Sequence, residues 1–219
     1  MHPSMHRNER GSFVYYTCDR LPVRHAFTTK FGGVSRGDCE SLNLGFNRGD
    51  ERENVLENYR ILAEQLGVDE GRITMTKQIH DTQISVVTEG EAGMGLHQPM
   101  AWESDAIVTA LPETPLCGFY ADCVVTLFYD PETRTAGVAH AGWRGMAAGI
   151  LPKTVEVMAE KLGAKRESLI AVLGPSIRQE CFETDADVPE AMERLMGERV
   201  HPFIAEKGVK FHVDLQGIG

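Results

Sequence analysis

The segment between residues 123 and 145 constrains the fold more than any other part of the chain. Residues 123–129 carry the strongest strand pattern, and an Asp-Pro pair ends it. Residues 135–139 have the composition of a neighbouring strand, joined to the first by a short turn. His140 follows this second strand, small residues surround it, and Arg144 comes four positions later. Small residues let a backbone approach another group closely, so the turn predicts a site for a metal or an anionic substrate.

The remaining patterns intermix helices and strands without a regular βαβ repeat. Helical spacing covers residues 50–66, 146–162 and 188–196, and Pro152 either opens a second helix or kinks a single one. Strand-like runs cover residues 84–88, 105–109, 169–173 and 209–213, and residues 15–29 mix strand and turn. We therefore expect a single α+β domain over residues 13–219, with mixed β-sheets flanked by helices, and a loose N-terminal tail over residues 1–12.

Composition narrows the class of protein. The 219 residues are 42% hydrophobic and 25% charged, which is ordinary for a globular chain. The net charge of −10, without any Lys/Arg-rich block, argues against a nucleic-acid partner. No apolar run is long enough for a membrane span, and the first ten residues lack the apolar core of a secretory signal. We expect a cytoplasmic protein with no membrane partner. Glycine-rich dinucleotide and phosphate-loop motifs are absent from the sequence.

The five cysteines are odd in number and widely spaced, which fits a reducing compartment better than a disulfide framework. The sequence has no Cys-x-x-Cys pair, and this excludes a zinc ribbon or a thioredoxin-type site. A cysteine that binds metal in this chain would need partners from distant segments.

Three segments carry reactive side chains at element boundaries, and they contribute His80, Cys123 and His140. Two imidazoles and one thiolate suit tetrahedral zinc, and three protein ligands leave one position open, as in catalytic sites. An ion there would lower the pKa of its bound water. The same residue types also fit a blue-copper site, a Cys123 nucleophile with a histidine base, or unconnected core residues, including a buried His140 beside a packing tryptophan.

A second group of polar residues belongs to the glycine-rich loop after residue 29. Lys30 and Asn43 flank the Gly-Gly turn, together with Arg36. A basic side chain beside a backbone nest suits an anion, although a solvated loop fits the same residues. Asp105 either orients a ligand or caps the end of a strand.

Eight motifs in register resemble one known family, the laccase-domain purine nucleoside phosphorylases, long labelled multicopper polyphenol oxidases, whose bacterial relatives are also named peptidoglycan-editing factors. These motifs are residues 27–35, 42–45, 78–80, 104–109, 121–123, 140–145, 174–177 and 181–183. The resemblance runs from about residue 27 to residue 215.

The resemblance implies a YfiH-like fold and phosphorolysis of adenosine, inosine or methylthioadenosine to the free base and ribose 1-phosphate, with adenosine deaminase activity as well. The family site maps onto His80, Cys123 and His140, with zinc as the ion and copper possible. Lys30, Asn43 and Arg144 are then expected to bind substrate, and the partners are a small nucleoside and phosphate.

The sequence departs from the family pattern in two places. Ser176 stands where relatives often carry cysteine, so a cysteine there is not essential in this chain. Relatives usually continue for several dozen residues beyond position 215, whereas this sequence ends at Gly219. We therefore expect the usual C-terminal segment to be lacking, and a monomer.

Other functions fit the same residues. Copper-dependent phenol oxidation is the older family label, but the chain has eight histidines and no His-x-His pair, which multicopper oxidases normally use. A cysteine-type hydrolase that edits peptidoglycan precursors would use Cys123 as nucleophile. A non-enzymatic scaffold with a vestigial site is the fourth alternative.

Overall fold

The β8–β9 hairpin forms the centre of the largest sheet. In the computed structural model, which describes residues 5–100 and 102–219, β8 (Val124–Asp130) pairs antiparallel with β9 (Thr135–Ala141). The strand order is β10-β8-β9-β6-β5. β10 (Ile170–Leu173) and β6 (Ala106–Thr109) are antiparallel to their neighbours, whereas β5 (Ile84–Val87) runs parallel to β6. The expected strand pair and mixed sheet are confirmed.

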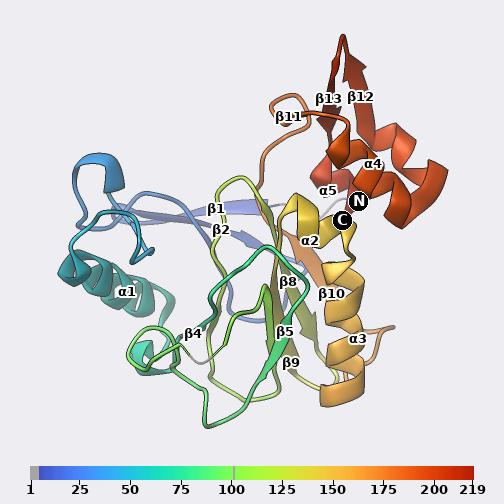
Figure 1. Ribbon diagram of the computed structural model, residues 1–219. Coiled ribbons are helices and arrows are strands. Elements are labelled where there is room, and N and C mark those ends of the chain that lie inside the picture. The colour runs from blue at the N-terminus through green and yellow to red at the C-terminus, as the bar shows by residue number, and fades with distance from the viewer. Residues whose placement is uncertain (1–4, 101) are drawn as a thin grey trace.

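Two helices follow β9 and cover one face of this sheet (Figure 1). α2 (Trp143–Ala147) is short, and α3 (Ile150–Leu162) starts after Gly149, whose φ of 78° interrupts the helical run. Pro152 lies in the first turn of α3, where its missing N–H needs no partner, so the proline opens a second helix and does not kink a single one. Ile150 and Met158 of α3 are fully buried in the largest apolar cluster.

The opposite side of the sheet holds the N-terminal half of the chain, with α1 (Arg52–Leu66) at its outer edge (Figure 1). α1 buries Val55, Tyr59 and Leu62 in a second apolar cluster with Phe13 and Ile73. β2 (Phe13–Cys18) and β3 (Phe27–Thr28) form a small antiparallel sheet. β4 (Thr74–Met75) pairs parallel with β7 (Leu116–Cys117).

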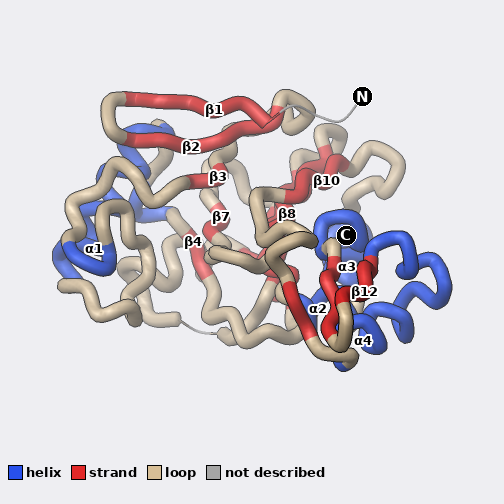
Figure 2. The backbone as a smooth tube through the Cα atoms, turned by 90° about the horizontal axis from the view of Figure 1, so that it is seen from above, coloured by secondary structure: helices blue, strands red, loops and turns tan. Residues whose placement is uncertain are grey.

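The expectation of a loose tail over residues 1–12 differs from the structure. β1 (Met5–Arg10) pairs antiparallel with β2 along its whole length, and residues 1–4 lie outside the described residues. Figure 2 shows β1 as the outermost strand, with β2 and β3 between it and β7. The side chains of β1 are largely exposed, so this strand is held mainly by backbone hydrogen bonds to β2. Such bonds require no apolar pattern in the sequence, and for this reason the strand was not predicted.

The last forty residues form a separate small layer beside α2. β11 (Glu183–Thr184), β13 (Lys210–Val213) and β12 (Ile204–Lys207) make an antiparallel sheet, and α4 (Asp187–Met196) packs against α2. Short helical turns complete the chain: η1 (Gly37–Cys39), η2 (Glu70–Arg72), η3 (Gly197–Phe203) and α5 (Leu215–Ile218). Among the described residues, no helix combines the length and apolarity that a membrane crossing requires.

Candidate metal centre and its cavity

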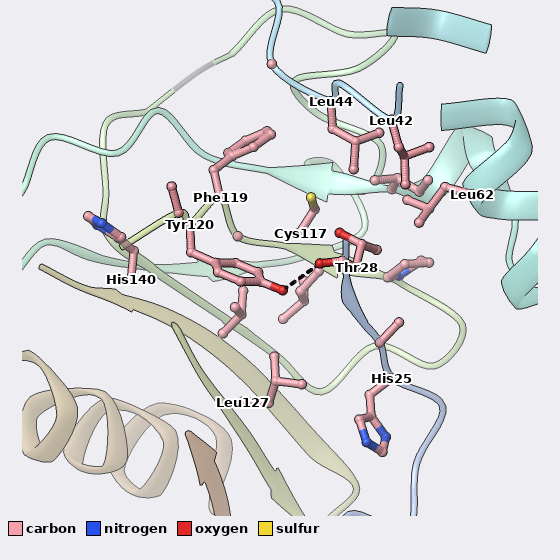
Figure 3. Close-up of a pocket in the computed structure, with 18 of the residues that line it drawn as sticks. His25, Thr28, Leu42, Leu44, Leu62, Cys117, Phe119, Tyr120, Leu127 and His140 are labelled. Carbon is pink, nitrogen blue, oxygen red and sulfur yellow. Dashed lines mark hydrogen bonds between the residues drawn. The ribbon is translucent and has the colours of Figure 1, made fainter. Parts of the chain in front are cut away.

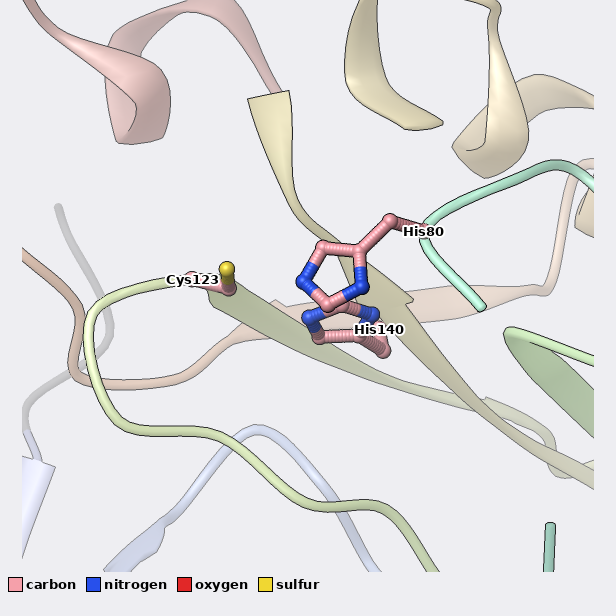
Figure 4. Close-up of side chains that lie close together, drawn as sticks. All are labelled: His80, Cys123 and His140. Atoms are coloured by element: carbon pink, nitrogen blue, oxygen red, sulfur yellow. The ribbon is translucent and has the colours of Figure 1, made fainter. Parts of the chain in front are cut away.

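The structure brings together the three residues that the sequence selected as metal ligands. The ligand atoms of His80, Cys123 and His140 all lie within 4.8 Å of one another. The two imidazole rings meet edge to face, with centroids 4.7 Å apart and planes at 83°. In Figure 4 the sulfur of Cys123 lies on the side to which one nitrogen of each ring points. Residues 43 and 17 positions apart in the chain thus form one cluster.

Each of the three side chains comes from a different segment around the central hairpin. Cys123 immediately precedes β8, and His140 lies near the end of β9, opposite Val125 in the strand ladder. His80 belongs to the loop between β4 and β5 and has a φ of 61°, in the left-handed region that residues other than glycine rarely adopt. His140 is buried, Cys123 is half-buried and His80 is exposed, so the cluster is open on one side.

The electrostatics of the cluster follow from this burial. Burial lowers the pKa of His140, and the hydrogen bond with Asp105 opposes that effect. Burial also raises the pKa of the Cys123 thiol, with further contributions from the negative charges of Asp122 and Asp105. A metal needs a neutral imidazole and a thiolate. His140 is therefore already in the required form at neutral pH, whereas Cys123 would release its proton on coordination.

Gly142 forms a wall of the cluster. A Cβ placed on Gly142 would lie 3.1 Å from His80 Cδ2, 3.3 Å from Cys123 Sγ and 3.4 Å from His140 Cε1. Its φ of −62° is open to any residue, so space and not backbone conformation calls for glycine here. The close approach expected from the small residues around His140 is therefore made by Gly142, against all three ligand residues.

The donor set and its spacing fit zinc. Tetrahedral zinc with nitrogen and thiolate ligands holds the ligand atoms about 3.4–3.6 Å apart. The spread of up to 4.8 Å in the structure therefore needs only side-chain rotations that move the atoms by about 1 Å. Copper accepts the same two imidazoles and one thiolate, so the donors alone do not select the ion.

Gln78 links the segment before His80 to the segment before Cys123. Its Nε2 donates to the carbonyl of Phe119 at 2.9 Å, and its Oε1 accepts from the Phe119 N–H at 2.6 Å. Gln78 stands two residues before His80, and Phe119 stands four residues before Cys123. Gln78 belongs to the motif of residues 78–80, but its role does not follow from sequence, because only the fold reveals its partner.

A cavity of about 1020 Å³ extends from the cluster towards α1. His80, Cys123 and His140 line one end. Figure 3 shows His140 at this end and Leu42, Leu44 and Leu62 at the other. Figure 3 also shows Phe119 and Tyr120 between the two ends, where the Tyr120 hydroxyl donates to the Thr28 carbonyl at 3.1 Å. The site thus combines a polar end at the candidate metal centre with an apolar end beneath α1.

The expected substrate-binding residues differ in where they lie. Lys30 and Asn43 line the cavity. The amide of Asn43 is engaged within its own loop, since Nδ2 donates to Asp50 at 3.0 Å and Oδ1 accepts from the Gly45 N–H at 3.0 Å. Arg144 is exposed on α2, with its guanidinium 4.2 Å from the centroid of the Trp143 ring, and is not among the cavity-lining residues. Arg48 also lines the cavity, although it lies outside the motifs from which the substrate-binding residues were predicted.

Solved structures with a similar fold cover nearly the whole chain. YlmD from Geobacillus stearothermophilus matches with a TM-score of 0.88 and 29% identity, over 97% of this chain and 80% of that protein. The Bacillus licheniformis hypothetical protein YfiH matches with a TM-score of 0.86 and 27% identity, over 96% of this chain and 79% of that protein. The α+β, YfiH-like fold expected from the sequence is therefore confirmed.

Two relatives in sequence share one name. A purine nucleoside phosphorylase of Deinococcus radiodurans is 39% identical over 197 residues, which is 90% of this chain and 72% of that protein. The purine nucleoside phosphorylase YlmD of Bacillus subtilis is 36% identical, over 77% of this chain and 62% of that protein. This chain therefore spans about two thirds of the length of these relatives.

A family model described as multi-copper polyphenol oxidoreductase laccase matches residues 24–219. This range includes the central sheet, all three residues of the candidate metal centre and the cavity beside it. The chain belongs to this laccase-like family, and its relatives from Deinococcus radiodurans and Bacillus subtilis are named purine nucleoside phosphorylases.

Proposed function

We propose that this chain cleaves purine nucleosides with inorganic phosphate, and that adenosine, inosine and methylthioadenosine are its substrates. The observation that carries the proposal is that the His80–Cys123–His140 cluster and Lys30 line the same cavity. The names of the relatives support the reaction class. The volume of about 1020 Å³ is ample for a nucleoside together with phosphate.

His80, Cys123 and His140 would hold the metal ion, with zinc as the proposed ion. When bound, such an ion supplies Lewis-acid chemistry and an activated water, which adenosine deamination requires. The proposal therefore includes a second activity, the conversion of adenosine to inosine with release of ammonia.

The residues of the chain itself supply binding and orientation. Lys30 and Arg48 bring positive charge to the cavity, where it stabilises a bound phosphate. Leu42, Phe119 and Leu127 offer apolar surface that packs against the nucleoside and displaces water. Phosphate then attacks the anomeric carbon of the ribose, the glycosidic bond breaks, and its electron pair passes to the purine nitrogen, which takes a proton.

The test is a phosphate-dependent assay with the purified protein. Inosine is expected to give hypoxanthine and ribose 1-phosphate only when phosphate is present, and Cys123→Ala is expected to abolish turnover and metal content together. Cys181→Ala is the matched control, because Cys181 is an exposed free cysteine away from the cavity lining. Hypoxanthine release without phosphate, or full turnover in Cys123→Ala, would contradict the proposal.

Copper-dependent phenol oxidation is the second candidate, favoured by the two-imidazole, one-thiolate donor set and by the description of the family. An anaerobic assay separates the two. Phenol oxidation must stop without oxygen, whereas phosphorolysis continues.

Hydrolysis of a peptidoglycan precursor with Cys123 as nucleophile has less support. Burial raises the pKa of this thiol, whereas a nucleophilic cysteine needs a lowered pKa. Inactivation by iodoacetamide that zinc does not prevent would favour this alternative.

A further inference from the structure

Asp105 is a buried carboxylate that contacts both histidine-bearing segments of the candidate metal centre. It immediately precedes β6, and only 1% of it is exposed. Its Oδ1 lies 2.8 Å from His140 Nδ1, and its own carbonyl accepts from the His140 N–H at 2.7 Å. No feature of the sequence pattern distinguishes these contacts from an ordinary strand cap.

The contact with His140 selects one form of the imidazole ring. An ionised carboxylate only accepts hydrogen bonds, so Nδ1 of His140 carries the proton and donates to Asp105. Nε2 is then left with its lone pair free for a metal. A carboxylate behind a metal-binding histidine also fixes the orientation of the ring and raises its basicity as a ligand.

The same carboxylate holds the loop that carries His80. The backbone N–H groups of Ile79, His80 and Asp81 donate to its two oxygens at 3.1, 2.9 and 2.9 Å. Three successive N–H groups that converge on one anion define the conformation of a loop. His80 has a φ of 61°, and such a conformation persists only where surrounding contacts impose it.

We propose that Asp105 is the positioning residue of the metal centre: one buried carboxylate both fixes the Nδ1–H form of His140 and holds the His80 loop in the conformation that brings its ring beside His140. The inference rests on the metal centre of the proposed function, but not on which reaction that centre performs. It assigns no contact with substrate to Asp105.

The test compares Asp105→Asn with Asp130→Asn. Asparagine keeps the size of aspartate, but its NH₂ group must face N–H donors of either the 79–81 loop or His140, so at least one set of bonds is lost. Asp130 is an equally buried aspartate with four donors, and it lies at the other end of β8, about 20 Å from Cys123. This control therefore shows how far the loss of any buried, hydrogen-bonded carboxylate changes zinc affinity through a general loss of stability.

Zinc affinity is the first measurement, by competition between a chelating dye and the metal-free protein. We expect Asp105→Asn to bind zinc about 10- to 100-fold more weakly than the unaltered chain, and Asp130→Asn to bind as the unaltered chain does. Equal zinc affinity in Asp105→Asn and the unaltered chain, or equal losses in both variants, would overturn the proposal.

The second measurement needs no variant, and it applies even where Asp105→Asn fails to fold. Long-range ¹H–¹⁵N spectra of the metal-free protein report which ring nitrogen of His140 carries the proton. The proposal requires Nδ1, and a proton on Nε2 would refute it. If the unaltered chain binds neither zinc nor copper, the metal centre of the proposed function fails, and this spectrum still decides whether Asp105 holds His140 as proposed.

Discussion

Gly142 shows how a residue without a side chain shapes the site. An added Cβ would lie 3.1 Å from His80 Cδ2 and 3.3 Å from Cys123 Sγ, both closer than an ordinary contact, and 3.4 Å from His140 Cε1. The His80 ring and Cys123 Sγ would each have to move by a few tenths of an ångström to make room for that atom. A side chain at position 142 would therefore shift His80 and Cys123 relative to each other.

Gly142→Ala tests this dependence. The added methyl group presses on the His80 ring and on Cys123 Sγ, so we expect zinc affinity to fall about tenfold or more, with little change in the unfolding temperature. Gly90→Ala is the control, because a Cβ on Gly90 meets no atom within 4 Å. Zinc affinity that is equal in both variants would show that Gly142 is not a wall of the metal centre.

The family motifs predict that both Lys30 and Arg144 bind substrate, but the two side chains differ in position. Lys30 lines the cavity, whereas Arg144 is exposed and packs over Trp143. We therefore expect Lys30→Ala to raise the KM for phosphate about tenfold, the loss of one charge-assisted contact, and Arg144→Ala to have a much smaller effect. The measurement is the rate of phosphorolysis as a function of phosphate concentration. A larger effect of Arg144→Ala would place the phosphate outside the cavity and beside α2.

At the scale of elements, the long apolar runs were predictable and the short strands were not. β8 and β9 have seven residues each, and turn residues separate them, so their pairing follows from sequence. α1 and α4 likewise show helical spacing. β3, β4 and β7 have two residues each, which is too short to show an alternating apolar and polar pattern. Each of these strands pairs with a distant segment, so its partner strand cannot be read from the local sequence.

The candidate site was likewise predictable only in part. The ligand types His80, Cys123 and His140 could be selected from sequence because each stands at the boundary of a recognisable element and belongs to a motif of the family. The contacts that hold them could not. Asp105 accepts hydrogen bonds from the N–H groups of residues 79–81, and Gln78 bonds with Phe119 at a separation of 41 residues. Both contacts depend on how the strands are ordered in the sheet. The exposed position of Arg144 depends on where α2 begins.

Asp50 links the glycine-rich loop to the start of α1. Its carboxylate accepts from the Ser35 hydroxyl at 2.6 Å, from Asn43 Nδ2 at 3.0 Å and from Asn54 Nδ2 at 3.1 Å. These hydrogen bonds lower the pKa of Asp50 from 3.8 to about 2, led by the bond from Ser35. One carboxylate therefore joins both sides of the loop that carries Lys30 to the first turn of the helix.

The lowered pKa gives this link a defined pH dependence. A carboxyl group whose pKa is lower in the folded state stabilises the fold above its unfolded pKa near 4, and the contribution is lost as pH falls towards 2. We expect Asp50→Asn to lower the free energy of unfolding at pH 7, and the difference from the unaltered chain to shrink between pH 4 and pH 2. Urea unfolding across this range measures it, and a difference that is independent of pH would contradict the assignment.

At the scale of the whole molecule, the site lies where two layers meet. The β8–β9 hairpin and the residue before it supply two candidate ligands, Cys123 and His140, and the N-terminal half supplies His80 and most of the cavity wall. The cavity therefore exists only when both halves of the chain are packed together. A cytoplasmic location and a monomeric state stay predictions from the sequence, as does the binding of nucleoside and phosphate without a nucleic-acid partner.

The proposed function depends on one metal ion that His80, Cys123 and His140 hold jointly. X-ray absorption at the zinc edge, on protein loaded with one equivalent of zinc, tests it most directly. We expect one sulfur neighbour at about 2.3 Å and two imidazole nitrogens at about 2.0–2.1 Å, with the sulfur signal absent in Cys123→Ala and kept in Cys181→Ala. A zinc environment without sulfur, or one that Cys123→Ala leaves unchanged, would contradict it.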